Sequence, residues 1–190
     1  MKKILTVLLA LIMALIMTGC EKEKTENEIA IESLNAEDVD MSEYGVSNSD
    51  YFKKVTPEKL FEMMNVKEGE MEYNFFFGKK GCADCVKAAK ICEKIAEELG
   101  IVVFYVDANE LADNEDYSSK YMEYFGTYSN ESFIVPFCVK VCDGVVCGFD
   151  YPDEIGGEMS DARMRVIYER LPEEYINEVV IPKANGTWEY

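Results

Sequence analysis

Gly81-Cys82-Ala83-Asp84-Cys85 is the stretch that decides how this chain folds and what chemistry it can carry. It lies between an apolar run at residues 73–77, which suits a buried strand, and an amphipathic pattern at residues 86–99, which predicts a helix. Free N–H groups and the dipole at a helix start favour the thiolate of the first cysteine. A thiolate is the species that attacks disulfides, so the stretch predicts a redox-active cysteine pair.

The helix pattern has one apolar and one charged face, and Gly100 predicts its end. A second apolar run at residues 101–106 follows at once. A strand, a helix and a strand joined by short links form a βαβ unit, so we expect the two strands to be parallel.

The rest of the chain predicts a short helix over residues 117–125 and then a β-hairpin. Its strands are residues 133–142 and 145–149, joined by a two-residue turn at Asp143-Gly144. A last helix begins after Ser160, and Thr56-Pro57 predicts the start of an earlier one.

Composition excludes several kinds of function. The chain has 190 residues, with 37 acidic against 19 basic side chains and a formal charge of −18, which should repel nucleic acid. It contains no histidine, so neither a histidine-based catalytic triad nor a histidine-ligated metal site is available.

The N-terminus predicts export and a lipid anchor. Residues 1–19 have the charged start and the apolar run of a signal peptide. Met17-Thr18-Gly19-Cys20 resembles a bacterial lipobox, which implies cleavage before Cys20 and a lipid on its sulfur. Residues 20–50 are acidic and predict a flexible tether, leaving residues 51–190 as the folded domain. We therefore expect a lipid-anchored protein on the outer face of a bacterial cell membrane, where disulfides persist.

The order of these elements resembles the thioredoxin fold over residues 55–182. The resemblance rests on Cys82-Ala83-Asp84-Cys85, on Ile134-Val135-Pro136 before the hairpin, and on the Asp143-Gly144 turn. It implies an α/β fold, with a central mixed sheet built from the βαβ unit and a C-terminal hairpin and flanked by helices. It also implies that Cys82 attacks, that Cys85 resolves, and that a cis Pro136 and the backbone of Val135 hold an extended substrate. No organic cofactor and no metal are implied.

Residues 76–82, Phe-Phe-Gly-Lys-Lys-Gly-Cys, and the lipobox look most similar to small extracytoplasmic thioredoxin-like proteins of Gram-positive bacteria, including the bacteriocin-transport-accessory group. The chain also departs from common thioredoxins. Gly81 stands where they have Trp, Ala83-Asp84 replaces Gly-Pro, and an apolar position near Phe76 replaces their buried Asp.

The charge around the pair favours a thiolate. Residues 79–94 hold five lysines against Asp84 and Glu93, a net charge of +3. Nearby cations stabilise a thiolate, so we expect them to lower the pKa of the first cysteine.

Four further cysteines have no assigned partner in the sequence. Cys92 lies on the apolar stripe of the helix and is interpreted as a small buried hydrophobe. A regular hairpin places Cys142 opposite Val145 and Cys138 opposite Phe149, with Cys138, Cys142 and Cys147 on one face. A second disulfide or a thiol relay is open, and these four cysteines allow three full pairings.

The predicted function is a thiol–disulfide oxidoreductase that acts on cysteine-containing extracytoplasmic proteins together with a redox partner protein. One alternative is a non-catalytic binding lipoprotein of the same fold. Another is a soft-metal site formed by Cys82, Cys85, Cys138 and Cys142. The direction of electron flow depends on a few tens of millivolts and is left open.

Overall fold

The computed structural model describes residues 36–65, 72–129, 132–152 and 159–169. The expected signal peptide, Cys20 and the tether up to residue 35 lie outside these residues. A compact unit begins at Ala36. Within the described ranges, no helix is both long and apolar enough to cross a bilayer.

The described residues form a six-stranded mixed sheet in the order β1-β2-β4-β3-β5-β6. Strands β2, β4 and β3 are parallel, which confirms the predicted βαβ unit, and the other strand pairs are antiparallel. The strands are β1 (Glu37–Asp38), β2 (Phe52–Lys54), β3 (Glu72–Gly78), β4 (Val103–Asp107), β5 (Phe137–Cys142) and β6 (Val145–Asp150).

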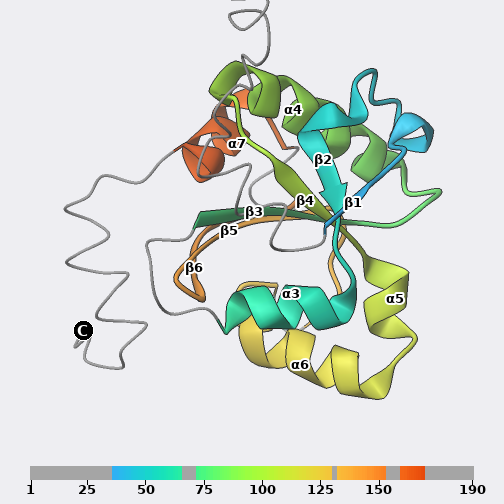
Figure 1. Ribbon diagram of the computed structural model, residues 1–190, viewed down its shortest axis with the longest axis vertical. Helices are drawn as coiled ribbons and strands as arrows, with labels where there is room; N and C mark the ends of the chain where they lie inside the picture. Colours follow the sequence, from blue (N-terminus) through green and yellow to red (C-terminus); the bar gives the residue numbers. More distant parts are fainter. Residues whose placement is uncertain (1–35, 66–71, 130–131, 153–158, 170–190) are drawn as a thin grey trace, which may run out of the picture. The chain divides into compact units, whose positions relative to one another are not determined.

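Helices cover both faces of this sheet (Figure 1). Helices α4 (Ala83–Leu99) and α7 (Asp161–Tyr168) lie on one side, and α3 (Pro57–Met64) and α6 (Glu115–Phe125) lie on the other. The short helix α5 (Ala108–Ala112), which the sequence analysis missed, follows β4. The mixed sheet, the βαβ unit and the C-terminal hairpin confirm the predicted thioredoxin-like fold class.

Local sequence signals explain where the main helices begin and end. The side chain of Thr56 accepts a hydrogen bond from the Lys59 N–H at the start of α3, and Ser160 caps α7 in the same way. Helix α4 ends at Gly100, whose φ of 65° is a left-handed conformation that glycine adopts without a steric cost.

Alternation along β3 divides the core into two faces. Phe76 belongs to a buried cluster with the inner side chains of α4 and α7, and we name this side of the sheet the cysteine face. Phe75 and Phe77 point to the opposite side, where Phe77 contacts Tyr121 and Phe125 of α6. We name that side the aromatic face.

The predicted tether ends earlier than residue 50. Residues 36–50 supply β1, the short 3₁₀ helix η1 (Ser42–Tyr44) and the start of a second one, η2 (Ser49–Tyr51). Met41 is 0% exposed and Tyr44 is 3% exposed, both within the cysteine-face cluster. The acidic composition concealed these anchors, because a few well-placed apolar side chains are enough to dock an otherwise polar segment.

The hairpin differs from the predicted one in two ways. Strand β5 begins at Phe137, so residues 133–136 form a loop. The Asp143-Gly144 turn pairs Cys142 with Val145 as expected, but a bulge between Lys140 and Val141 then shifts the register. Cys138 therefore lies opposite Asp150 and not opposite Phe149, because one extra residue enters β6.

Candidate functional site

Cys82 and Cys85 form a disulfide at the start of α4, with their Cα atoms 5.2 Å apart. Cys82 is the N-cap residue, and its Sγ accepts a hydrogen bond from the Cys85 N–H at 3.1 Å. Cys82 is half-buried, whereas Cys85 is 0% exposed. The pair therefore combines a partly exposed cysteine with a fully buried one.

The loop before β5 brings Val135 and Pro136 to this pair. The carbonyl oxygen of Val135 lies 4.0 Å from Cys82 Sγ, across 53 positions of sequence. The Val135–Pro136 peptide bond is cis, Val135 is half-buried and Pro136 is buried. The contact arises because β5 runs next to β3, the strand that leads into the cysteine pair. The predicted site residues Cys82 and Val135 thus lie side by side.

Carboxylates partly neutralise the predicted positive charge around Cys82. Lys80 pairs with Glu43 at 2.7 Å, and Lys87 pairs with Asp84 at 3.2 Å. The Glu43 carboxylate raises the pKa of Lys80. Glu43 belongs to η1, which the sequence analysis had placed in the tether, so the count of +3 along the chain overstated the local charge.

Two tyrosines that the sequence analysis missed lie on the cysteine face, close to the end of β3. The hydroxyls of Tyr44 and Tyr105 share a hydrogen bond at 2.9 Å, and both rings contact the buried Phe76. Burial raises the pKa of both phenols, so both stay protonated at neutral pH. Neighbouring residues of a strand point to opposite faces of the sheet. The order Phe104-Tyr105 in β4 was therefore the sequence signal that could have identified Tyr105.

The interpretation of Cys92 as a buried residue is confirmed, since its side chain is 0% exposed. It has a partner, however, because its Sγ lies 3.7 Å from the Sγ of Cys138 and 3.7 Å from the Tyr168 hydroxyl. Cys142 and Cys147 come near each other at the β5–β6 hairpin, where Cys142 pairs with Val145 and the Cys147 thiol donates to the Lys140 carbonyl. The neighbouring Cys147 thiol, together with burial, raises the pKa of Cys142.

The four-cysteine metal hypothesis does not fit this arrangement. Cys138 lies opposite Phe76 on β3, and Cys142 lies opposite Glu72, four residues further along β5. Four residues of strand span about 13 Å, so these sulfurs do not converge with Cys82 and Cys85 on one ion. Across the part of the chain that the structure describes, no group of three or more metal-ligating side chains is found.

Comparison with known proteins finds similarity only at the level of shape. No protein-family model and no curated protein sequence matches the chain. Thioredoxin from Fasciola hepatica is similar with 20% identity and a TM-score of 0.40, covering 58% of this chain and 89% of that one. Oxidised thioredoxin O1 from Arabidopsis thaliana has 15% identity and a TM-score of 0.44, covering 63% and 100%. Thioredoxin F from spinach chloroplast has 18% identity and a TM-score of 0.39, covering 53% and 80%.

With identities of 20% or less and TM-scores below 0.5, these structures carry no further argument about this chain. The fold assignment rests on the strand order and on the strand directions of this chain. The mixed sheet, with a close cysteine pair at the start of the helix that follows β3, is a thioredoxin-like fold.

Proposed function

We propose that this protein is a thiol–disulfide oxidoreductase that acts through Cys82 and Cys85 on cysteine-containing proteins outside the cell membrane. The observation that supports this proposal is the unequal burial of the two bonded cysteines. Cys82 is half-buried at the N-terminus of α4, and Cys85 is fully buried in the core behind it. A partner sulfur can approach only the first, and the second remains available to resolve the product.

The exchange runs through a mixed disulfide. In the reduced form, the Cys82 thiolate attacks one sulfur of a substrate disulfide, and the other substrate sulfur leaves as a thiolate that takes up a proton. Cys85 then loses its proton and attacks Cys82 Sγ, which releases the second substrate thiol and closes the Cys82–Cys85 bond. The same steps in reverse transfer the disulfide to a dithiol substrate.

Three features of the chain assist these steps. The hydrogen bond from the Cys85 N–H to Cys82 Sγ, together with the helix dipole, stabilises negative charge on that sulfur. The main chain of Val135 beside Cys82 offers polar groups along which an extended substrate chain can align. The apolar surroundings of Cys85 keep water away from the resolving sulfur.

The proposed location rests on residues 1–20 of the sequence. A signal peptide and lipidation of Cys20 would anchor the protein at the outer face of a bacterial membrane, in contact with exported proteins and with a redox partner protein. Metabolic labelling with a palmitate analogue tests the anchor. Label should enter the full chain and be lost in Cys20→Ser; labelling that survives this substitution would contradict it.

The test of the function is a trap in living cells. A Cys85→Ala variant of the full chain is expected to accumulate mixed disulfides at Cys82, since no thiol is left to resolve them. Acid quenching, alkylation, non-reducing gels and mass spectrometry identify the bound proteins. The matched control, Cys82→Ala/Cys85→Ala, should trap none of them. Equal signals from trap and control would contradict the proposal and would favour a non-catalytic binding protein.

The reduction potential of the pair decides the direction. Equilibration of the full chain with glutathione or dithiothreitol, followed by mass spectrometry, measures it. A value of about −270 mV or below favours a reductant, and one of about −120 mV favours an oxidant.

A further inference from the structure

All six cysteines in the described part of the chain fall into three pairs. Cys82 and Cys85 are bonded, Cys92 and Cys138 are 3.7 Å apart at their sulfurs, and the β5–β6 hairpin brings Cys147 near Cys142. Of the pairings that the sequence left open, the structure brings Cys92 next to Cys138 and Cys147 near Cys142, with all four as free thiols. The third pair differs from the second because one of its residues, Cys147, is only half-buried.

The β5–β6 hairpin is built in a way that brings the third pair together. Asp143 and Gly144 have φ values of 49° and 77°, which is the tight two-residue turn that sets Cys142 opposite Val145. The bulge then leaves Cys147 without a paired residue on β5, since Val146 pairs with Val141 and Gly148 pairs with Lys140. The Cys147 thiol turns toward β5 and donates to the Lys140 carbonyl at 3.4 Å.

The two thiols of this pair have unequal access to solvent. Cys142 is 2% exposed, whereas Cys147 is half-buried. This repeats the arrangement at Cys82 and Cys85, in which one cysteine is partly exposed and its neighbour is fully buried. Cys147 is thus placed to attack, and Cys142 is placed behind it to resolve.

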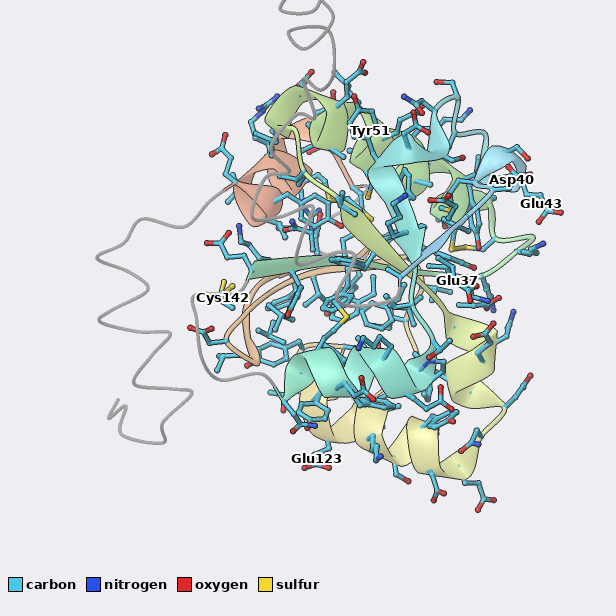
Figure 2. All side chains as sticks on the ribbon, in the orientation of Figure 1. Glu37, Asp40, Glu43, Tyr51, Glu123 and Cys142 are labelled. Atoms are coloured by element: carbon cyan, nitrogen blue, oxygen red, sulfur yellow. A yellow bond between two sulfur atoms is a disulfide. The ribbon has the colours of Figure 1, made fainter. Side chains whose placement is uncertain are left out.

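The third pair lies at the other end of the sheet from the Cys82–Cys85 disulfide. Cys142 is opposite Glu72 at the start of β3, and the disulfide follows Gly78 at the end of that strand. Six residue steps of strand separate the two ends by about 20 Å, too far for direct exchange between the pairs. Figure 2 labels Cys142 on one side of the molecule and Glu43, which pairs with Lys80 near Cys82, on the other.

We propose that Cys142 and Cys147 form a second dithiol–disulfide couple, which exchanges with low-molecular-weight or protein disulfides independently of Cys82 and Cys85. The Cys147 thiolate attacks a disulfide RSSR, forming Cys147–S–S–R and releasing RS⁻. The Cys142 thiolate then attacks Cys147 Sγ, closes the Cys142–Cys147 bond and releases a second RS⁻. Two electrons pass from the hairpin to RSSR, and the two thiol protons are taken up by the two RS⁻ groups.

The second pair provides an internal comparison. The sulfurs of Cys92 and Cys138 are also in contact, but both side chains are 0% exposed, enclosed with Met164 and Tyr168. A disulfide reagent has no path to them in the folded protein. Disulfide exchange at the hairpin, without any reaction at Cys92 and Cys138, would show that solvent exposure determines which pair reacts.

The experiment uses the full chain carrying Cys82→Ser and Cys85→Ser, so that only the hairpin couple can report. The protein is equilibrated with mixtures of reduced and oxidised glutathione, quenched with acid, alkylated and mapped by mass spectrometry. We expect a reversible loss of two hydrogens from the peptide that contains both Cys142 and Cys147. Cys147→Ser should abolish this loss, and Cys138→Ser, the matched control, should leave it unchanged.

Two results would overturn the proposal. One is full alkylation of both thiols at every glutathione ratio, and the other is a disulfide that maps to a different pair. A second measurement, on the reduced wild-type chain, tests whether Cys147 is the attacking thiol. Maleimide should label Cys147 at least tenfold faster than Cys92 or Cys138. Equal rates at all of these sites would also contradict the proposal. Because the redox titration lacks Cys82 and Cys85, its failure would leave the proposed function of that pair intact.

Discussion

The two faces of the sheet carry different kinds of side chain. On the cysteine face, Cys85, Cys92 and Cys138 pack with small alanines of α4 and with the hydroxyl-bearing Tyr168. The aromatic face is filled by rings in mutual contact. These are Phe75, Phe77, Phe104, Tyr121, Phe125 and Phe137.

The comparison teaches that the bonded cysteines and the Cys92–Cys138 pair lie on one side of the sheet, whereas rings in mutual contact fill the other side. Large rings bury the most apolar surface per residue, so truncation of a ring on the aromatic face should cost much stability without touching a cysteine. Small side chains on the cysteine face let α4 approach closely and hold the sulfurs in place. If this division is correct, each face can be altered with limited effect on the other.

The largest expected effect is on the aromatic face. Phe125→Ala removes a fully buried ring that contacts Phe77 and Phe137, and should lower the free energy of unfolding by about 3–5 kcal/mol. Urea unfolding measures this loss. The glutathione equilibrium of Cys82 and Cys85 should stay unchanged per folded molecule. Val166→Ala, on an exposed position of α7, is the control and should change stability by less than about 0.5 kcal/mol.

A parallel shift of the Cys82–Cys85 equilibrium in Phe125→Ala would break the comparison. It would mean that the packing of the aromatic face sets the geometry of the cysteine pair across the sheet.

The second largest effect is the pH dependence of stability that arises from Tyr121 on the aromatic face. Burial raises the pKa of Tyr121 to about 12, above its unfolded value of about 10. The unfolded chain therefore loses this proton first as pH rises. The contribution of Tyr121 to the free energy of unfolding is fully present below pH 10 and falls by about 2 kcal/mol by pH 12. Tyr121→Phe should remove this part of the decline, as measured by urea unfolding at pH 9 and at pH 12. An unchanged decline would contradict the assignment.

The third effect is on the cysteine face. Cys92→Ala deletes one buried sulfur next to Cys138 and should cost about 1 kcal/mol of stability. Exchange at Cys82 should keep its rate, because Cys92 lies about two turns of α4 beyond Cys85. A loss of exchange greater than tenfold would identify Cys92 as part of the working site and would revive the thiol relay.

The smallest effect is electrostatic. Glu43→Ala frees the Lys80 ammonium, so the rate of alkylation of reduced Cys82 at pH 6 should rise, by less than about threefold. Salt at about 1 M should erase the difference. Glu62→Ala, which breaks the Lys59–Glu62 pair on α3, is the matched control and should leave the rate unchanged.

Most of the fold follows from local patterns in the sequence. The ring-rich run in β3, the stripe and the terminal glycine of α4 and the Asp143-Gly144 turn each specify one element through a short-range rule. These rules did not predict that residues 36–50 pack against the cysteine face. Met41 and Tyr44 are held by contacts with distant residues and not by a local pattern.

The candidate site was predictable in its residues but not in its surroundings. The spacing of Cys82 and Cys85 and the position of Pro136 are visible in the sequence, and the 4.0 Å approach of the Val135 carbonyl agrees with them. The partner of Lys80 and the Tyr44–Tyr105 pair depend on a segment folding back onto α4. The pairing of Cys147 depends on a single-residue bulge, which no periodic pattern predicts.

The two outer strands of the sheet have a consequence for behaviour at high concentration. Strand β1 is two acidic residues long, and β6 is interrupted by its bulge. Short, charged or kinked edges are poor templates for a strand from another molecule. The same bulge that brings Cys147 to Cys142 therefore also protects the protein against edge-to-edge aggregation.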